Sequence, residues 1–246
     1  MNNLRWLYLA TMLLMSAIGY GQEKVVTSRS VESQIIKHSN YTVSYNKEYK
    51  VPNWVSWNIS KEKLSKTVSR SGINFMTDPA AHGAPVTPMD YSRSGYDRGH
   101  MCPAADNRFN QTAMEESFFM TNVCPQNHTL NEKTWADLEG ACRGWANHST
   151  VFVVSGPYFK EKPKTHIGRV RVAVPDGFWK VVLRQFKGKW VAIGFIMPNA
   201  DADDAFRNYA VCVDEVEKLT GHDFFSELDD AIENEIESRF DLSSWR

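Results

Sequence analysis

The 246-residue sequence lacks an excess of basic residues, because 28 Lys and Arg stand against 29 Asp and Glu, a formal net charge of −1. A protein that coats nucleic acid without specificity normally carries a strong basic excess, so any phosphate chemistry here must be confined to a local site. Internal repeats and low-complexity linkers are absent as well. Hydrophobic and charged fractions of 42% and 23% exclude a disordered or multi-pass membrane protein and leave a globular chain.

Long apolar runs are missing except near the N-terminus. Residues 6–17 are nearly apolar, Arg5 is the only charge before Glu23, and residues 19–21 form a small-x-small pattern. The run is shorter than the roughly 20 residues of a transmembrane helix. We therefore expect residues 1–21 to be a signal peptide, with an uncleaved anchor as the alternative. The mature protein, residues 22–246, would then be periplasmic or extracellular, without membrane attachment.

Cysteine is scarce, and no C-x-x-C pair occurs, which argues against a structural zinc site. The four cysteines are Cys102, Cys124, Cys142 and Cys212. An oxidising compartment permits two disulfides among them, in three connectivities. Free cysteines, in contrast, usually behave as small buried hydrophobic side chains. Both alternatives stay open at this point.

Hydrophobic periodicity predicts strands and two longer helices. Strands are expected at 41–45 and 54–59, both half-buried, and at 151–155, 168–174, 178–183 and 190–196. Residues 71–95, rich in Gly, Pro, Ser and Asp, predict a long surface loop. One apolar helical stripe comprises Trp135, Leu138, Cys142 and Trp145, and a second comprises Phe206, Tyr209, Val213 and Val216, with a stop at Gly221. Residues 223–241 predict an acidic, solvated amphipathic segment. Strands on both sides of a central helix favour a single α+β domain.

Chemically active side chains gather in the string Asp97-Arg98-Gly99-His100. Side chains alternate along an extended segment, so Arg98 and His100 would share one face and Asp97 would point into the protein. Arg binds phosphate oxygens bidentately, and His can take a proton from water near neutral pH. We expect Gly99 to let the backbone approach a ligand. His128 is a second candidate base, ranked below His100 because it has no Arg partner.

Asn131 lies about thirty residues further on, at the start of the helix predicted from the first apolar stripe, and Glu139 lies within that helix. Asn131 fits either a helix N-cap or an oxygen ligand for a hard cation such as Mg²⁺. In one continuous helix, Glu139 would lie roughly 12 Å further along the axis, on the same general side. It would therefore contact the cation through water, with an exposed surface residue as the alternative.

Three motifs in this order resemble the DNA/RNA non-specific endonucleases: DRGH, then S-x-x-x-TN-x-x-PQ from Ser117 to Gln126, then LN-x-x-x-W-x-x-LE from Leu130 to Glu139. The resemblance extends over roughly residues 40–240. It implies a central β-sheet flanked by helices and a ββα-metal (His-Me finger) catalytic core. It also implies metal-dependent hydrolysis of DNA and RNA with little sequence specificity.

The resemblance further implies a role for each matching residue. His100 would be the general base, Arg98 would hold the phosphate, Asn131 would bind Mg²⁺ (or Mn²⁺) and Glu139 would fix the hydrated ion. Asp97 and Asn122 would support these groups, and the products would carry 5′-phosphates. Ile73 precedes Asn74 where some members of the family have an arginine, so Arg70 is the candidate for that substrate contact. Two alternatives stay open, a phosphodiesterase for small substrates and a non-catalytic nucleic-acid-binding relative. An inhibitor protein is conceivable as a partner, although no residue indicates one.

Overall fold

A computed structural model describes residues 26–27 and 33–246, and the predicted signal peptide lies outside them. The strands are β1 Val26–Thr27, β2 Gln34–Lys37, β3 Tyr41–Asn46, β4 Val51–Ile59, β5 Asp97–His100, β6 Val123–Gln126, β7 Val151–Tyr158, β8 His166–Ile167, β9 Val172–Ala173, β10 Gly177–Phe186, β11 Lys189–Pro198, β12 Ala210–Val211 and β13 His222–Asp223. The α-helices are α2 Lys61–Leu64, α3 Gln111–Glu116, α4 His128–Glu132, α5 Thr134–Trp145, α6 Val213–Thr220 and α7 Asp230–Glu237. Short 3₁₀ helices cover Pro88–Tyr91, Ala104–Asn107, Met120–Asn122, Phe206–Tyr209 and Leu242–Trp245.

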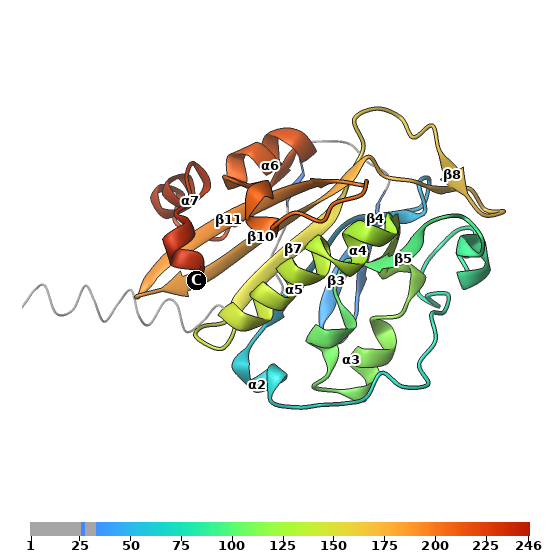
Figure 1. Ribbon diagram of the computed structural model, residues 1–246, viewed down its shortest axis with the longest axis horizontal. Coiled ribbons are helices and arrows are strands. Elements are labelled where there is room, and N and C mark those ends of the chain that lie inside the picture. The colour runs from blue at the N-terminus through green and yellow to red at the C-terminus, as the bar shows by residue number, and fades with distance from the viewer. Residues whose placement is uncertain (1–25, 28–32) are drawn as a thin grey trace, which may run out of the picture.

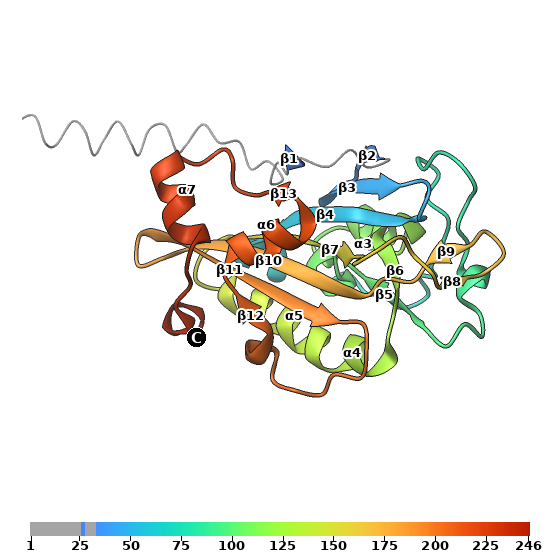
Figure 2. The ribbon, with the colours of Figure 1, turned by 90° about the horizontal axis from the view of Figure 1, so that it is seen from above.

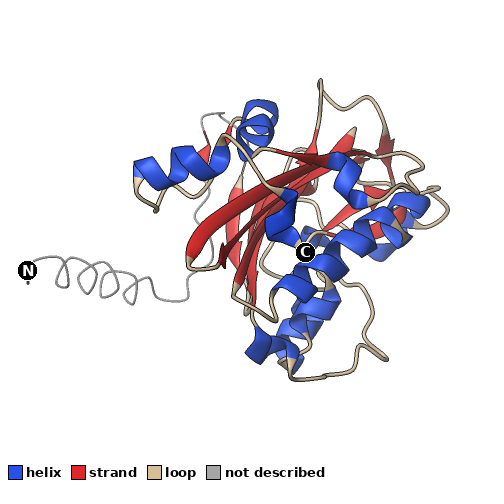
Figure 3. Cartoon of the chain, turned by 60° about the vertical axis from the view of Figure 1, so that its left-hand side comes forward, coloured by secondary structure: helices blue, strands red, loops and turns tan. Residues whose placement is uncertain are grey.

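Seven strands form one antiparallel sheet in the order β12-β11-β10-β7-β4-β3-β2. Helices α4 and α5 lie on one side of this sheet, and α6 and α7 lie on the other (Figures 1 and 2). The secondary-structure view in Figure 3 shows the same arrangement, with the sheet between two groups of helices. The prediction of an α+β fold with a central sheet flanked by helices is confirmed.

The sheet separates two hydrophobic cores, because the side chains of a strand point alternately to its two faces. In β10, Phe178 and Val182 pack with α5 in the first core, whereas Trp179, Val181 and Leu183 pack in the second core with α6 and α7. Strands β3 and β4 are buried along nearly their whole length. The expectation of half-buried strands at 41–45 and 54–59 is therefore wrong, because both faces of the sheet are covered.

Two predicted elements are shorter than expected. Within 168–174 only Val172–Ala173 is a strand, and it pairs with His166–Ile167 across a turn. The second helical stripe is interrupted, because Phe206–Tyr209 is a 3₁₀ helix and Ala210–Val211 pairs with β11 before α6 begins. The predicted stop is correct, since Gly221 ends α6 in the left-handed conformation with φ of 72°.

The four cysteines are free, and three of them, Cys102, Cys124 and Cys142, are buried. The alternative of small, buried free cysteines therefore describes these three residues. Among the residues that the structure describes, no helix is long and apolar enough to cross a bilayer.

Candidate active site

Strands β5 and β6 form a separate antiparallel pair, with Asp97 opposite Gln126 and His100 opposite Val123. Helix α4 follows β6 after Asn127 and contacts β5. The unit is thus two strands and a helix, the ββα arrangement that the sequence motifs predict. It places the DRGH string beside the helix that carries Asn131.

Six residues singled out from the sequence line one cleft of about 380 Å³ beside this unit. They are Arg70, Asp97, Arg98, His100, Asn131 and Glu139. Arg70 and Glu139 come from outside the ββα unit, on the loop after α2 and on α5. Together with Glu132, which also lines it, the cleft contains two guanidinium groups, three carboxyl groups, one imidazole and one amide, a set that can bind and hydrolyse a phosphodiester.

His100 is held between aromatic rings. Its ring centroid lies 4.9 Å from that of Phe75 and 5.1 Å from that of Phe118. Burial, together with the positive charge of Arg70, lowers the pKa of His100 to about 3. Its Nε2 is buried and has no hydrogen-bond partner among the described residues. The imidazole is therefore neutral at physiological pH, with unused capacity to accept a proton.

Arg98 lies on the same side of the cleft as His100, as the strand alternation predicts. Its guanidinium carbon lies 4.9 Å from the centroid of Phe75, the ring that also contacts His100. Arg70 stacks in the same way on Phe118, at 5.4 Å. Two aromatic side chains thus position both cations and the imidazole. Sequence reasoning did not identify Phe75 or Phe118 as part of the site, because an aromatic residue near a motif is ordinarily core.

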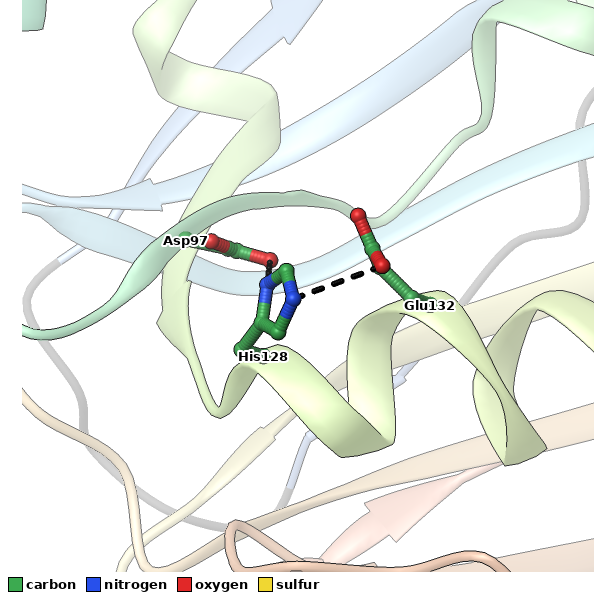
Figure 4. A group of neighbouring side chains, drawn as sticks. All are labelled: Asp97, His128 and Glu132. Carbon is green, nitrogen blue, oxygen red and sulfur yellow. Dashed lines mark hydrogen bonds and ion pairs between the residues drawn. The ribbon is translucent and has the colours of Figure 1, made fainter.

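Asp97 orients Asn131. Its Oδ2 accepts a hydrogen bond from Asn131 Nδ2 at 3.0 Å and lies 2.9 Å from His128 Nδ1 (Figure 4). The expectation that Asp97 points into the protein is wrong, since its side chain is about one-third exposed and lines the cleft. Because the amide nitrogen is engaged by Asp97, the Oδ1 of Asn131 is the atom left to serve as a ligand. An amide oxygen beside a carboxylate is a donor set that suits a hard divalent cation.

Asn131 and Glu139 do not share one helix. Asn131 belongs to α4, and the chain breaks at Lys133, with φ −116° and ψ −94°, before α5 begins. The N-cap of α4 is Asn127, whose side chain accepts from the backbone N–H of Leu130. The N-cap alternative for Asn131 is therefore wrong, and the break invalidates the single-helix distance between Asn131 and Glu139.

Glu139 is partly buried in the cleft wall. Burial raises its pKa to about 7, although Lys180 and Arg143 oppose the shift. At neutral pH this carboxyl group is therefore close to half-ionised. A cation bound in the cleft would favour the ionised form.

Asn122 supports the catalytic strand from inside. It is fully buried, its Nδ2 donates to the backbone oxygens of Cys102 and Ser117 at 2.8 Å, and its Oδ1 accepts from the Cys102 N–H at 2.9 Å. These bonds tie the segment just after His100 to the segment before β6. This position is compatible with the supporting role that the resemblance implies for Asn122. Its side chain does not line the cleft.

His128 begins α4 and is 65% exposed at its side chain. Its Nε2 lies 3.4 Å from Glu132, four residues later on the same helix (Figure 4). Hydrogen bonding to Asp97 and the nearby carboxylates raise the pKa of His128. Ring nitrogens engaged by two carboxylates make His128 a weaker candidate for the base than His100. Glu132, which also lines the cleft, could have been found from its i,i+4 spacing to His128.

Gly99 is required for packing inside the protein, and the expectation that it lets a ligand approach is not supported. A Cβ at this position would lie 2.0 Å from Gln126 Oε1 and 2.6 Å from Gln126 Cβ.

Gly99→Ala is expected to destabilise the fold by about 1–3 kcal/mol, because the pair β5–β6 must separate. Urea unfolding measures the loss. Gly144→Ala is the matched control, because the described residues leave open space within 4 Å of its Cβ position on α5 and stability should be kept or raised. Equal stability of the two variants would contradict this packing argument.

Comparison with known proteins agrees with the geometry. A family model described as DNA/RNA non-specific endonuclease matches residues 21–231. The chain is 33% identical over 229 residues to a nuclease of Nostoc sp., which covers 87% of this chain and 81% of the relative. It is 35% identical over 211 residues to mitochondrial nuclease EXOG of Xenopus laevis, covering 78% of this chain and 58% of that protein.

A crystal structure of an EndoG/EndoGI complex superimposes on this chain with a TM-score of 0.75 and 31% sequence identity, covering 80% of this chain and 88% of that one. Mitochondrial endonuclease G of Homo sapiens is 30% identical over 203 residues, which is 77% of this chain and 68% of the human protein. The family model, these relatives and the ββα unit agree. The chain belongs to the DNA/RNA non-specific endonuclease family.

Proposed function

We propose that this protein is a metal-dependent endonuclease that hydrolyses DNA and RNA with little sequence specificity and leaves 5′-phosphates. The observation that carries the proposal is the convergence of Arg98, His100, Asn131 and Glu139 on one cleft, with Asp97 fixing the Asn131 amide. The side chains in the cleft can engage phosphate and a cation. Affinity would then come from phosphate contacts, which are the same in every sequence.

His100 acts as the general base in this proposal. The neutral imidazole takes a proton from water as the water oxygen attacks phosphorus, and the bond from phosphorus to the 3′ oxygen breaks. A base with a pKa of about 3 is weak. The bound phosphodiester brings a negative charge next to His100 and offsets the charge of Arg70, which raises the basicity of the imidazole. Proton removal is thereby coupled to substrate binding.

Arg98 and Arg70 hold the phosphate. Both guanidinium groups stack on aromatic rings, which restricts their motion before substrate arrives. A planar guanidinium can donate two parallel hydrogen bonds to phosphate oxygens. Two such groups fix the phosphorus relative to His100.

The Oδ1 of Asn131 would hold Mg²⁺, which supplies positive charge for the transition state and for the leaving 3′ oxygen. Asp97 keeps the amide in the orientation that presents this oxygen to the cleft. Glu139 contributes negative charge to the same cleft, and Asn122 keeps the backbone after His100 in place.

Metal binding is expected to strengthen as the pH rises through about 7, because Glu139 is neutral below its raised pKa and negatively charged above it. Titration of the protein with Mn²⁺ between pH 5.5 and 8.5 measures the effect. In Glu139→Gln the affinity should be lower and almost independent of pH in this range. A wild-type affinity that does not change with pH would show that Glu139 does not take part.

Substrate class is tested with three substrates: closed circular plasmid DNA, a structured RNA and a small aromatic phosphodiester. We expect both polymers to be cut and the small ester to be cut far more slowly, because it forms fewer phosphate contacts. Products should accept a phosphate from polynucleotide kinase only after phosphatase treatment, since their 5′ ends already carry one. Preferential cleavage of the small ester would favour the phosphodiesterase alternative.

We further propose that the protein is exported and that residues 1–21 are removed on the way. The relatives named above include mitochondrial nucleases as well as a bacterial one, so homology alone does not decide the compartment. N-terminal sequencing of the protein from the periplasm or the medium should begin at Gln22. A protein inhibitor is conceivable, because the EndoG structure is that of a complex described in terms of EndoG inhibition.

A further inference from the structure

The face of the sheet opposite the cleft carries α6 and α7, which pack on β11 (Figure 2). Their apolar sides are buried in the second core through Val213 and Val216 of α6 and Ile236 of α7, with Ile232 packed against it. The prediction of an acidic amphipathic segment at 223–241 agrees with α7, whose apolar side packs on the core. Packing against the sheet also brings the acidic sides of the two helices together.

Each helix carries a pair of carboxylates at neighbouring positions. Asp214 and Glu217 are three residues apart on α6, and Glu233 and Glu237 are four apart on α7. Like charges at these spacings destabilise an isolated helix. Oxygens of Asp214, Glu217 and Glu237 nevertheless all lie within 4.8 Å of one another. The fold has therefore gathered three like charges across a helix–helix contact.

Glu237 is the least compensated member of this group. Its side chain is only 6% exposed, and its Oε1 is buried without a hydrogen-bond partner among residues 33–246. Glu217, in contrast, accepts a hydrogen bond from the backbone N–H of Phe224 at 2.9 Å. A buried carboxylate without a partner is costly, so the site requires either a proton or a cation.

Among the described residues, the charged groups that most strongly affect Glu237 are all acidic. After burial itself, the strongest influences on it are Glu217, Glu233, Asp214 and Asp223, and together they raise its pKa to about 9. A divalent cation would balance these neighbouring carboxylates and give the buried Glu237 oxygen a partner.

We propose that Asp214, Glu217 and Glu237 form a binding site for a hard divalent cation, preferentially Ca²⁺, which joins α6 to α7 far from the catalytic cleft. Ca²⁺ binds oxygen ligands at 2.3–2.6 Å, so oxygens on opposite sides of the ion are about 4.6–5.2 Å apart, and three oxygens that all lie within 4.8 Å of one another can share one such ion. Mg²⁺ requires near-ideal octahedral geometry and prefers to keep its waters, so a site made of three carboxylates suits it less well. Asp214 is exposed, which gives the ion access and leaves room for water to complete its coordination.

Thermal unfolding of the mature protein with added CaCl2 tests the site. The experiment uses the Asn131→Ala background at pH 8, so that cation binding in the cleft contributes little. We expect the melting temperature to rise by roughly 5 °C or more at a calcium concentration about a hundred times the dissociation constant. In Glu237→Gln this rise should be lost, and the calcium-free protein should be at least as stable as its parent, because a buried acid has been removed.

Glu235→Gln is the matched control, because Glu235 lies on the same helix but is exposed and paired with Arg239 at 2.7 Å. It should keep the full response to calcium. If Glu237→Gln fails to fold, Asp214→Asn, an exposed position, should weaken calcium binding at least tenfold. Absence of a calcium response in the parent, or an undiminished response in the folded Glu237 or Asp214 variant, would overturn the proposal. Neither result bears on nuclease activity.

Discussion

His100→Ala is expected to lower kcat on plasmid DNA by about 10³–10⁴-fold, near the upper end of what general-base catalysis contributes. The imidazole is neutral, has an unpaired nitrogen and lies between Phe75 and Phe118 in the cleft wall. Alanine removes the proton acceptor without disturbing the bound phosphate, which the arginines hold. KM should therefore change only a few-fold, and the measurement is steady-state cleavage of plasmid at saturating Mg²⁺.

His128→Ala distinguishes the two candidate bases. Its imidazole is exposed and engaged by Asp97 and Glu132, so we expect its loss to cost far less than that of His100. If His128→Ala abolished cleavage and His100→Ala left it intact, the assignment of the base would be wrong. Melting temperatures of both variants show whether a loss of activity reflects unfolding.

Asn131→Ala is expected to lower kcat about 10³-fold at ordinary Mg²⁺ concentrations. The cleft loses its amide oxygen ligand, and stabilisation of transition-state charge by a metal ion amounts to several kcal/mol, each 1.36 kcal/mol being tenfold in rate. Added Mg²⁺ or Mn²⁺ should restore part of the activity, because the remaining carboxylates still attract the ion. Mn²⁺ affinity measured by calorimetry should fall in parallel.

Asp97→Ala is expected to lower metal affinity less than Asn131→Ala does. It removes the hydrogen bond that orients the amide but leaves the amide itself, so metal affinity should fall only about 10–100-fold. A larger loss in Asp97→Ala than in Asn131→Ala would mean that Asp97, rather than Asn131, is the principal ligand. Unchanged metal affinity in Asn131→Ala would contradict the proposed site.

The site was predictable wherever its residues belong to short motifs of fixed local geometry. The DRGH string had to be an extended segment, and alternation along it correctly placed Arg98 and His100 together. The stripe of Trp135, Leu138, Cys142 and Trp145 correctly predicted the helix α5, because four buried positions at helical spacing have few other solutions. These patterns depend on residues close together in the sequence, so they can be identified without knowledge of tertiary contacts.

What depended on tertiary contact was not predictable. The break at Lys133, which separates α4 from α5, has no Gly or Pro to signal it. Phe75 and Phe118 reach His100 from a distant loop and from the second residue after α3, and nothing in their local sequence indicates this. Gly99 was assigned to ligand approach because its close approach to Gln126, which pairs with Asp97 in the β5–β6 register, could not be predicted from the local sequence.

The central claim is that this cleft hydrolyses nucleic acid with His100 as base and a divalent metal as cofactor. Its most direct test is digestion of closed circular plasmid by the purified mature protein and by His100→Ala, each with Mg²⁺ and with EDTA. We predict nicked and then linear plasmid for the wild type with Mg²⁺ alone, and intact plasmid in the other three reactions over the same time. Equal cleavage by His100→Ala, or undiminished wild-type cleavage in EDTA, would contradict the account.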